Sequence, residues 1–168
     1  MGSARIIVRP AAPEDAPELA RIQTESWKAA FADILTVETL ACCTDLPRCT
    51  EMLRGVVESR RGMFYLAERD GSACGSLFWR RDAEQSDCAE IVALHSLRES
   101  WGSGVGRALM ERALADIAAA GNRRVFLWVF ADNHRARRFY EKCGFSLSGD
   151  SHASRFDDAL ELCFEKQI

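Results

Sequence analysis

The feature that most restricts the fold of this chain is a strand, a glycine-rich turn and a helix in direct succession. Residues 88–97 form a largely apolar run, residues 102–106 read Gly-Ser-Gly-Val-Gly, and apolar side chains recur at helical spacing through residues 104–120. Glycines leave main-chain N–H groups uncovered, and the start of a helix adds unpaired N–H groups and a positive dipole end. Such a turn favours an anionic ligand such as a phosphate or diphosphate, to which Arg107 would add charge.

Two nucleotide-binding motifs of similar chemistry are excluded by residue identity. A Walker A loop requires Gly-x-x-x-x-Gly-Lys followed by Ser or Thr, and the chain contains no such string. The dinucleotide fingerprint Gly-x-Gly-x-x-Gly requires a third glycine where this sequence has Arg107. A tight turn with glycines at positive φ and no ligand remains an alternative.

A second pattern lies in the helix expected over residues 132–143. Asn133, Ala136 and Tyr140 are spaced i, i+3 and i+7, so they line one face of the helix over two turns. The small Ala136 between two polar side chains leaves room for a ligand along the helix. The alternative is structural: Asn133 at the helix N-terminus and Tyr140 as a core aromatic with a solvated hydroxyl.

The hydrophobic periodicity predicts seven strands and four helices in one domain, residues 1–168. The expected strands cover residues 6–8, 63–68, 72–80, 88–97, 125–130, 145–148 and 159–164. The expected helices cover residues 13–31, 47–59, 104–120 and 132–143. Hairpin-linked strands followed by strand–helix–strand crossovers predict an α/β (α+β) fold, with a mixed, mostly antiparallel sheet flanked by helices.

Composition excludes several classes of function. A formal net charge of −3 provides no general attraction to nucleic acid or to an anionic membrane surface, so neither is an expected partner. The seven cysteines are odd in number, include the adjacent Cys42 and Cys43, and contain no Cys-x-x-Cys, which indicates reduced thiols and no metal site. Residues 1–6 lack the hydrophobic segment of a signal peptide, so we expect a cytoplasmic protein.

Together, the two patterns resemble the GNAT superfamily of N-acetyltransferases. The acetyl-CoA motif of that family, Gln or Arg, two residues, Gly, one residue and Gly or Ala, falls on residues 101–106, with Gly104 and Gly106 matching. Its second motif is matched at Asn133, at Ala136 and in the string Phe-Tyr-Glu-Lys-x-Gly-Phe of residues 139–145. The resemblance implies a GNAT-like sheet that splays between residues 88–97 and 125–130 to admit acetyl-CoA, with coenzyme A as a product. Trp101 stands where the family has Gln or Arg, which implies the loss of one side-chain contact to the diphosphate.

The resemblance also implies the roles of individual residues. The implied cofactor-binding residues are Leu94, Ser96, Trp101, Gly102, Ser103, Gly104, Val105, Gly106, Arg107, Asn133, Ala136 and Tyr140. The implied catalytic residues are Tyr140, as the general acid for the departing thiolate, and Glu90, as a base acting directly or through water. His95 and water remain alternative bases, although strand alternation allows only one of Leu94 and His95 to face the cleft.

The acceptor is expected to be a primary amine of a small molecule or peptide, and a homodimer is compatible with the resemblance. A CoA-binding sensor with weak or lost catalysis is the alternative to an enzyme, and Trp101 favours it. Scattered acidic residues hint at a cationic acceptor. They are Asp33, Glu38, Asp45, Asp157 and Asp158.

Overall fold

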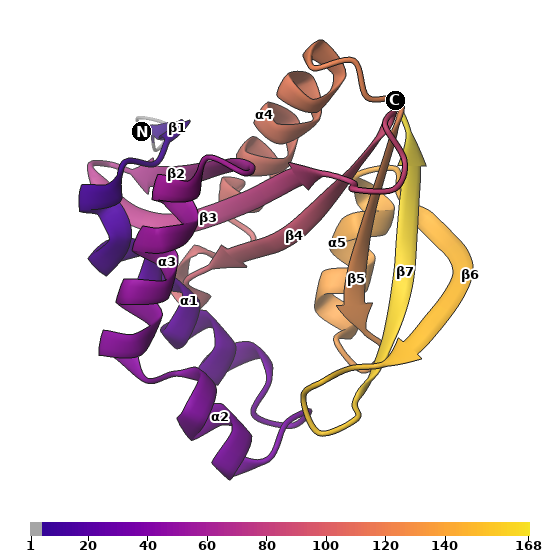
Figure 1. Ribbon diagram of the computed structural model, residues 1–168. Coiled ribbons are helices and arrows are strands. Elements are labelled where there is room, and N and C mark those ends of the chain that lie inside the picture. The colour runs from indigo at the N-terminus through magenta and orange to yellow at the C-terminus, as the bar shows by residue number, and fades with distance from the viewer. Residues whose placement is uncertain (1–4) are drawn as a thin grey trace.

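A computed structural model describes residues 5–168 as one mixed sheet with helices on both faces (Figure 1). Residues 1–4, on which part of the signal-peptide expectation rests, lie outside the described residues. The strands are β1 (Ile6–Pro10), β2 (Met63–Arg69), β3 (Ser72–Arg81), β4 (Cys88–Ser96), β5 (Arg124–Phe130), β6 (Ser146–Ala153) and β7 (Leu160–Gln167). The helices are α1 (Ala16–Ala30), α2 (Val37–Cys43), α3 (Leu46–Ser59), α4 (Val105–Ala119) and α5 (His134–Lys142), with short 3₁₀ turns at Pro13–Asp15 and Arg98–Ser100.

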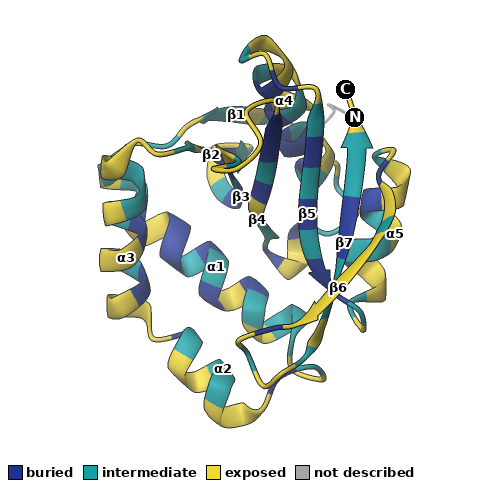
Figure 2. Ribbon diagram, turned by 45° about the vertical axis from the view of Figure 1, so that its right-hand side comes forward, coloured by how far each residue is buried: buried dark blue, intermediate teal, exposed yellow. Residues whose placement is uncertain are grey.

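The sheet has seven strands in the order β1-β2-β3-β4-β5-β7-β6. Every neighbouring pair is antiparallel except β4 and β5, which are parallel and connected through α4. Helices α1 and α3 pack together over one face, while α4 and α5 cover the other (Figures 1 and 2). The predicted mixed, mostly antiparallel architecture is therefore confirmed.

The sheet splays between β4 and β5, and this opening decides where a ligand can enter. Only three residue pairs join the two strands, from Cys88 opposite Arg124 to Glu90 opposite Phe126. Beyond Glu90 the strands diverge, as Figure 1 shows. The divergence begins next to a β-bulge: Trp79 of β3 pairs with Ile91 and Phe78 pairs with Ala93, which leaves Val92 as an extra residue. A bulge bends its strand and increases its twist, so β4 turns away from β5.

One helix was missing from the sequence prediction. Helix α2 has seven residues, none of them buried, and Val37 is 79% exposed. Without a buried face it has no apolar periodicity to detect, and its N-terminus depends on a local cap, in which the Thr36 side chain accepts a hydrogen bond from Thr39 N. Strand β6 also extends to Ala153, five residues beyond the predicted end at residue 148, although nearly all of it is exposed. Backbone pairing with β7 holds it in place.

The core fills both faces of the sheet. Leu19 and Ile22 of α1 are fully buried on one side, and Leu109 and Ile117 of α4 on the other. None of the helices in residues 5–168 combines the length and the apolar character needed to cross a membrane.

Candidate active site

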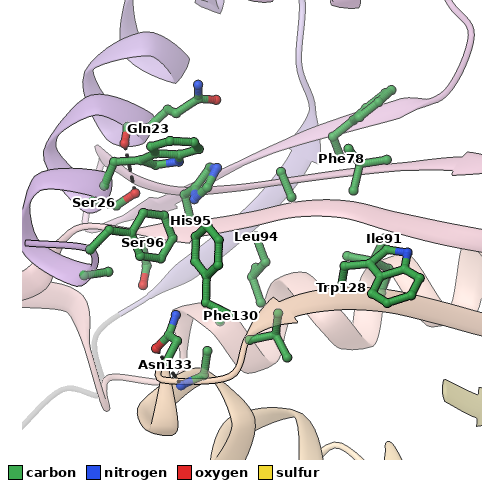
Figure 3. A pocket seen from close by; sticks show the side chains of 18 of the residues that line it. Gln23, Ser26, Phe78, Ile91, Leu94, His95, Ser96, Trp128, Phe130 and Asn133 are labelled. Carbon is green, nitrogen blue, oxygen red and sulfur yellow. Dashed lines mark hydrogen bonds between the residues drawn. The ribbon is translucent and has the colours of Figure 1, made fainter. Parts of the chain in front are cut away.

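A cavity of about 1360 Å³ passes through the opening between β4 and β5. One half is bordered by the glycine-rich turn after β4 and by one face of α5, and the other half lies beneath α1, α3 and the β6–β7 loop. Because the cavity passes through the sheet, it borders both sides of β4. Leu94 and His95 both line it, although their side chains point to opposite sides of the strand (Figure 3). The expectation that only one of them faces the cleft was therefore wrong.

The glycine-rich turn adopts the conformation that its residue types predict. Gly102 has φ 75° and Gly104, the N-cap of α4, has φ 94°, values that glycine adopts without a steric penalty. Gly102, Gly104, Gly106 and Arg107 all line the cavity. The first N–H groups of α4 lack intrahelical acceptors by their position, so this end of the helix can bind an anion.

Ser103 and Val105, two of the expected cofactor-binding residues, do not line the cavity. Ser103 turns inward: its N–H and its hydroxyl both donate to the Ser100 carbonyl oxygen, at 3.2 and 2.6 Å. Val105 is fully buried, and its side chain lies where a Cβ on Gly75 would stand. The Val105 side chain therefore anchors the turn to the sheet, and only its main-chain N–H remains for a ligand.

Trp101 makes one contact through its indole N–H and another through the face of its ring. Its indole N–H donates to the Ser96 carbonyl oxygen at 3.1 Å, which occupies one of the two lone pairs of that acceptor on β4. The Arg135 guanidinium of α5 lies 3.6 Å from the centre of the Trp101 ring, a cation–π stack that joins the two sides of the opening. Burial lowers the pKa of Arg135 from its usual value. The cavity thus has a cation beside the position where the family carries Gln or Arg.

Three arginines of α5, Arg135, Arg137 and Arg138, lie within four residues of one another but have different contacts. Arg135 and Arg138 are both exposed, but Arg135 stacks on Trp101, and Arg137 donates to the Ala131 carbonyl oxygen at 2.8 Å. Arg135 lies two residues after Asn133 at the start of the helix, and this position is the sequence signal that could have identified it as a cavity residue.

Asn133, the N-cap of α5, and Ala136 both line the cavity, as their spacing predicts. Figure 3 shows Asn133 at the start of the helix. The Asn133 side-chain oxygen also caps the helix by accepting a hydrogen bond from Ala136 N at 3.2 Å. Asn133 therefore has the structural role of a helix cap, and this role does not exclude ligand binding. With its oxygen fixed by the cap, Asn133 is held in one orientation and its NH₂ group remains as a donor.

Tyr140 is 8% exposed and borders the cavity from the last turn of α5. Its ring packs against Phe145 and Phe164, so it belongs to the core as well. Burial raises the pKa of the Tyr140 hydroxyl to about 12. The hydroxyl therefore stays protonated at neutral pH and can donate a hydrogen bond to a group that gains negative charge.

Glu90 has a different environment from the one expected for a base in direct contact with substrate. Its carboxylate accepts two hydrogen bonds from Arg80, at 2.8 and 3.0 Å, and Glu90 is not among the residues that line the cavity. His95 does line the cavity, and burial lowers its pKa to about 4. His95 is therefore neutral at physiological pH and a weak proton acceptor.

Both tyrosines of the chain should resist ionisation, which gives a direct test of this geometry. Burial raises the pKa of Tyr65 to about 12, with a further contribution from its hydrogen bond to Asp116, and burial raises that of Tyr140 to about the same value. We expect phenolate absorbance of the folded protein to remain low at pH 10, where an unfolded chain is about half ionised.

The same two pKa values determine how the stability of the folded protein changes with pH. Because the folded-state pKa lies above the unfolded one, the contribution of the tyrosines to stability is complete below about pH 10 and is lost as the pH rises toward 12. Near-ultraviolet circular dichroism, recorded in parallel, shows whether the protein is still folded. Half-ionisation of either tyrosine near pH 10 in the folded protein would contradict the burial described.

A splayed mixed sheet with a glycine turn and the start of a helix beside the opening defines the class of acyl-CoA N-acyltransferases. The sequence matches the Acetyltransferase (GNAT) family over residues 18–145. An uncharacterized N-acetyltransferase of Mycobacterium tuberculosis is 30% identical over 135 residues, covering 80% of this chain and 85% of that protein. The chain therefore belongs to the GNAT acetyltransferase family and is an acyltransferase.

Solved structures agree on the fold. The PaiA N-acetyltransferase of Thermoplasma acidophilum, in complex with coenzyme A, has a TM-score of 0.84 at 23% identity, covering 98% of this chain and 99% of that one. YncA of Salmonella typhimurium, a putative acetyltransferase solved with its cofactor acetyl-CoA, has a TM-score of 0.75 at 14% identity, covering 97% and 94%.

Proposed function

We propose that this enzyme transfers the acetyl group of acetyl-CoA directly to a primary amine of a small molecule or peptide held in the same cavity. The observation that carries the proposal is the opening between β4 and β5, with Gly102–Arg107 on one side and Asn133, Ala136 and Tyr140 on the other. Two relatives of the same fold were solved with coenzyme A or acetyl-CoA.

The residues present fit such a substrate. The turn of residues 102–107 offers main-chain N–H groups, the positive end of α4 and the Arg107 side chain to a diphosphate. Arg135, stacked on Trp101, adds a second cation at this end of the cavity. The pantetheine arm would pass between β4 and Asn133. There Leu94 offers its main chain, whereas the Ser96 carbonyl is already bonded to Trp101.

In the proposed reaction the amine nitrogen attacks the thioester carbonyl, so that a C–N bond forms and the C–S bond breaks. Binding both reactants in one cavity removes most of the entropic cost of their encounter. Tyr140 donates a hydrogen bond to the sulfur as negative charge develops on it. The amine loses its proton to water, and Glu90 takes part only through such a water because Arg80 occupies its carboxylate.

Two measurements test this function. Titration calorimetry with coenzyme A should give a measurable binding heat, and acetyl-CoA with a panel of primary amines should release free thiol. Binding heat without thiol release for any amine would favour the alternative of a CoA-binding sensor. No heat with either coenzyme A or acetyl-CoA would contradict both.

We also propose a reducing compartment such as the cytosol. All seven cysteines are free in the structure, and several are buried as small apolar side chains.

A further inference from the structure

The part of the cavity that the cofactor would leave free has a distinct chemistry, and we call it the acceptor half. It is bordered by Trp27 of α1, Phe31 directly after α1, Arg48 of α3, Phe130 of β5, and Arg155 and Phe156 of the β6–β7 loop. We propose that it binds an amine that also carries a carboxylate on an apolar or aromatic body, such as an aromatic amino acid. This inference rests on the proposed acetyl transfer.

Aromatic rings form a continuous surface from β4 to the β6–β7 loop. The Trp27 ring lies 6.5 Å from His95 on β4 and packs edge-on against Phe156, at 5.2 Å between ring centres. Phe31 packs edge-on against Trp27, at 5.1 Å between ring centres, and against Phe130, at 5.0 Å between ring centres. Edge-to-face contacts of this kind hold a rigid apolar slot, which favours a flat or branched apolar group over an extended hydrophilic chain.

The charges at the far end of these rings are positive and unpaired. The Arg155 guanidinium lies 4.7 Å from the centre of the Phe156 ring, and Arg48 contacts the Cys42 sulfur at 3.8 Å. Neither arginine has a carboxylate within ion-pair distance in the described chain. Both are close to Cys43: burial raises the pKa of the Cys43 thiol, and the two guanidinium groups oppose this rise.

The described lining of the cavity contains little negative charge, and that charge is already hydrogen-bonded. Among the described residues that line it, Glu161 is the single carboxylate, and it is hydrogen-bonded to His152 at 2.8 Å. The acidic residues that hinted at a cationic acceptor do not line the cavity. Asp157, for example, accepts a hydrogen bond from Thr36 N at 2.7 Å and another from the Thr39 hydroxyl. A polycationic amine would meet two free arginines here, whereas a carboxylate would pair with them.

The test compares amines that differ only in the carboxylate. L-phenylalanine is paired with phenethylamine and L-tryptophan with tryptamine, while spermidine and kanamycin represent polycationic acceptors. Thiol release from acetyl-CoA gives kcat/KM for each. We expect each amino acid to exceed its decarboxylated partner by about tenfold or more, the value of one favourable charged contact.

A double variant tests whether Arg48 and Arg155 cause the higher kcat/KM of the amino acids. Arg48→Gln combined with Arg155→Gln should raise KM for the amino acids until their kcat/KM falls to that of the matched amines, and should leave phenethylamine and tryptamine unchanged. Arg138→Gln, which removes an exposed arginine that does not line the cavity, is the matched control and should change none of these values.

The inference is overturned if the amino acids are no better than their partners, if spermidine or kanamycin is preferred, or if no carboxylated amine is acetylated. Binding heat with coenzyme A distinguishes these failures from a failure of the proposed function, because the part of the cavity beside the glycine-rich turn and α5 does not include Arg48 or Arg155.

Discussion

Gly104→Val is expected to weaken coenzyme A binding by roughly 30- to 100-fold. Gly104 has φ 94°, and a β-branched residue is strained there by about 2–3 kcal/mol. The free variant relieves this strain by turning the backbone away from the binding conformation. Coenzyme A then has to restore the strained turn, so the cost appears as lost affinity. Titration calorimetry measures it.

Gly121→Val is the matched control for this substitution. Gly121 follows the other end of α4, has φ 87°, and like Gly104 has no neighbour that an added Cβ would clash with. Denaturant titrations should show that both variants remain folded, while only Gly104→Val loses affinity for coenzyme A. Equal affinities in the two variants would show that the turn of residues 102–107 does not bind the cofactor.

Tyr140→Phe is expected to lower kcat by about 30-fold while leaving the affinity for coenzyme A unchanged. With a pKa of about 12, the Tyr140 hydroxyl is a weaker acid than a thiol, whose pKa is about 8.5. Complete proton transfer to the thiolate is therefore unfavourable, and the hydroxyl contributes a hydrogen bond to a charged sulfur. Such a bond is worth about 2 kcal/mol, which corresponds to about 30-fold in rate. Steady-state kinetics at saturating acetyl-CoA measure the effect.

Tyr65→Phe separates this role from a general effect of removing a buried tyrosine hydroxyl. Tyr65 is fully buried, its hydroxyl donates to Asp116 at 2.6 Å, and neither residue lines the cavity. Its loss should cost about 1–2 kcal/mol of stability with kcat unaffected. If Tyr140→Phe retained the parental kcat, Tyr140 would be a core residue only.

Local sequence patterns were sufficient for most of the fold and for part of the candidate site. Strand alternation and helical periodicity predicted four of the five helices and most of the strands from their apolar faces, whereas β6 is nearly all exposed and only its first residues were predicted. Positive φ at Gly102 and Gly104 and the shared face of Asn133, Ala136 and Tyr140 follow from residue type and spacing over a few residues. Helix α2 escaped prediction because it has no buried face.

The other features of the fold and the site depend on contacts between segments that lie far apart in the sequence. A bulge at Val92, fixed by pairing with β3, bends β4 away from β5 and creates the opening. Arg135 meets Trp101, and Arg80 occupies Glu90, only because folding brings these segments together. The acceptor half joins α1, α3, β5 and the β6–β7 loop, none of which carries a motif of its own. Short-range periodicity reports which side of an element is buried, whereas the partner of each side chain depends on how the elements pack in three dimensions.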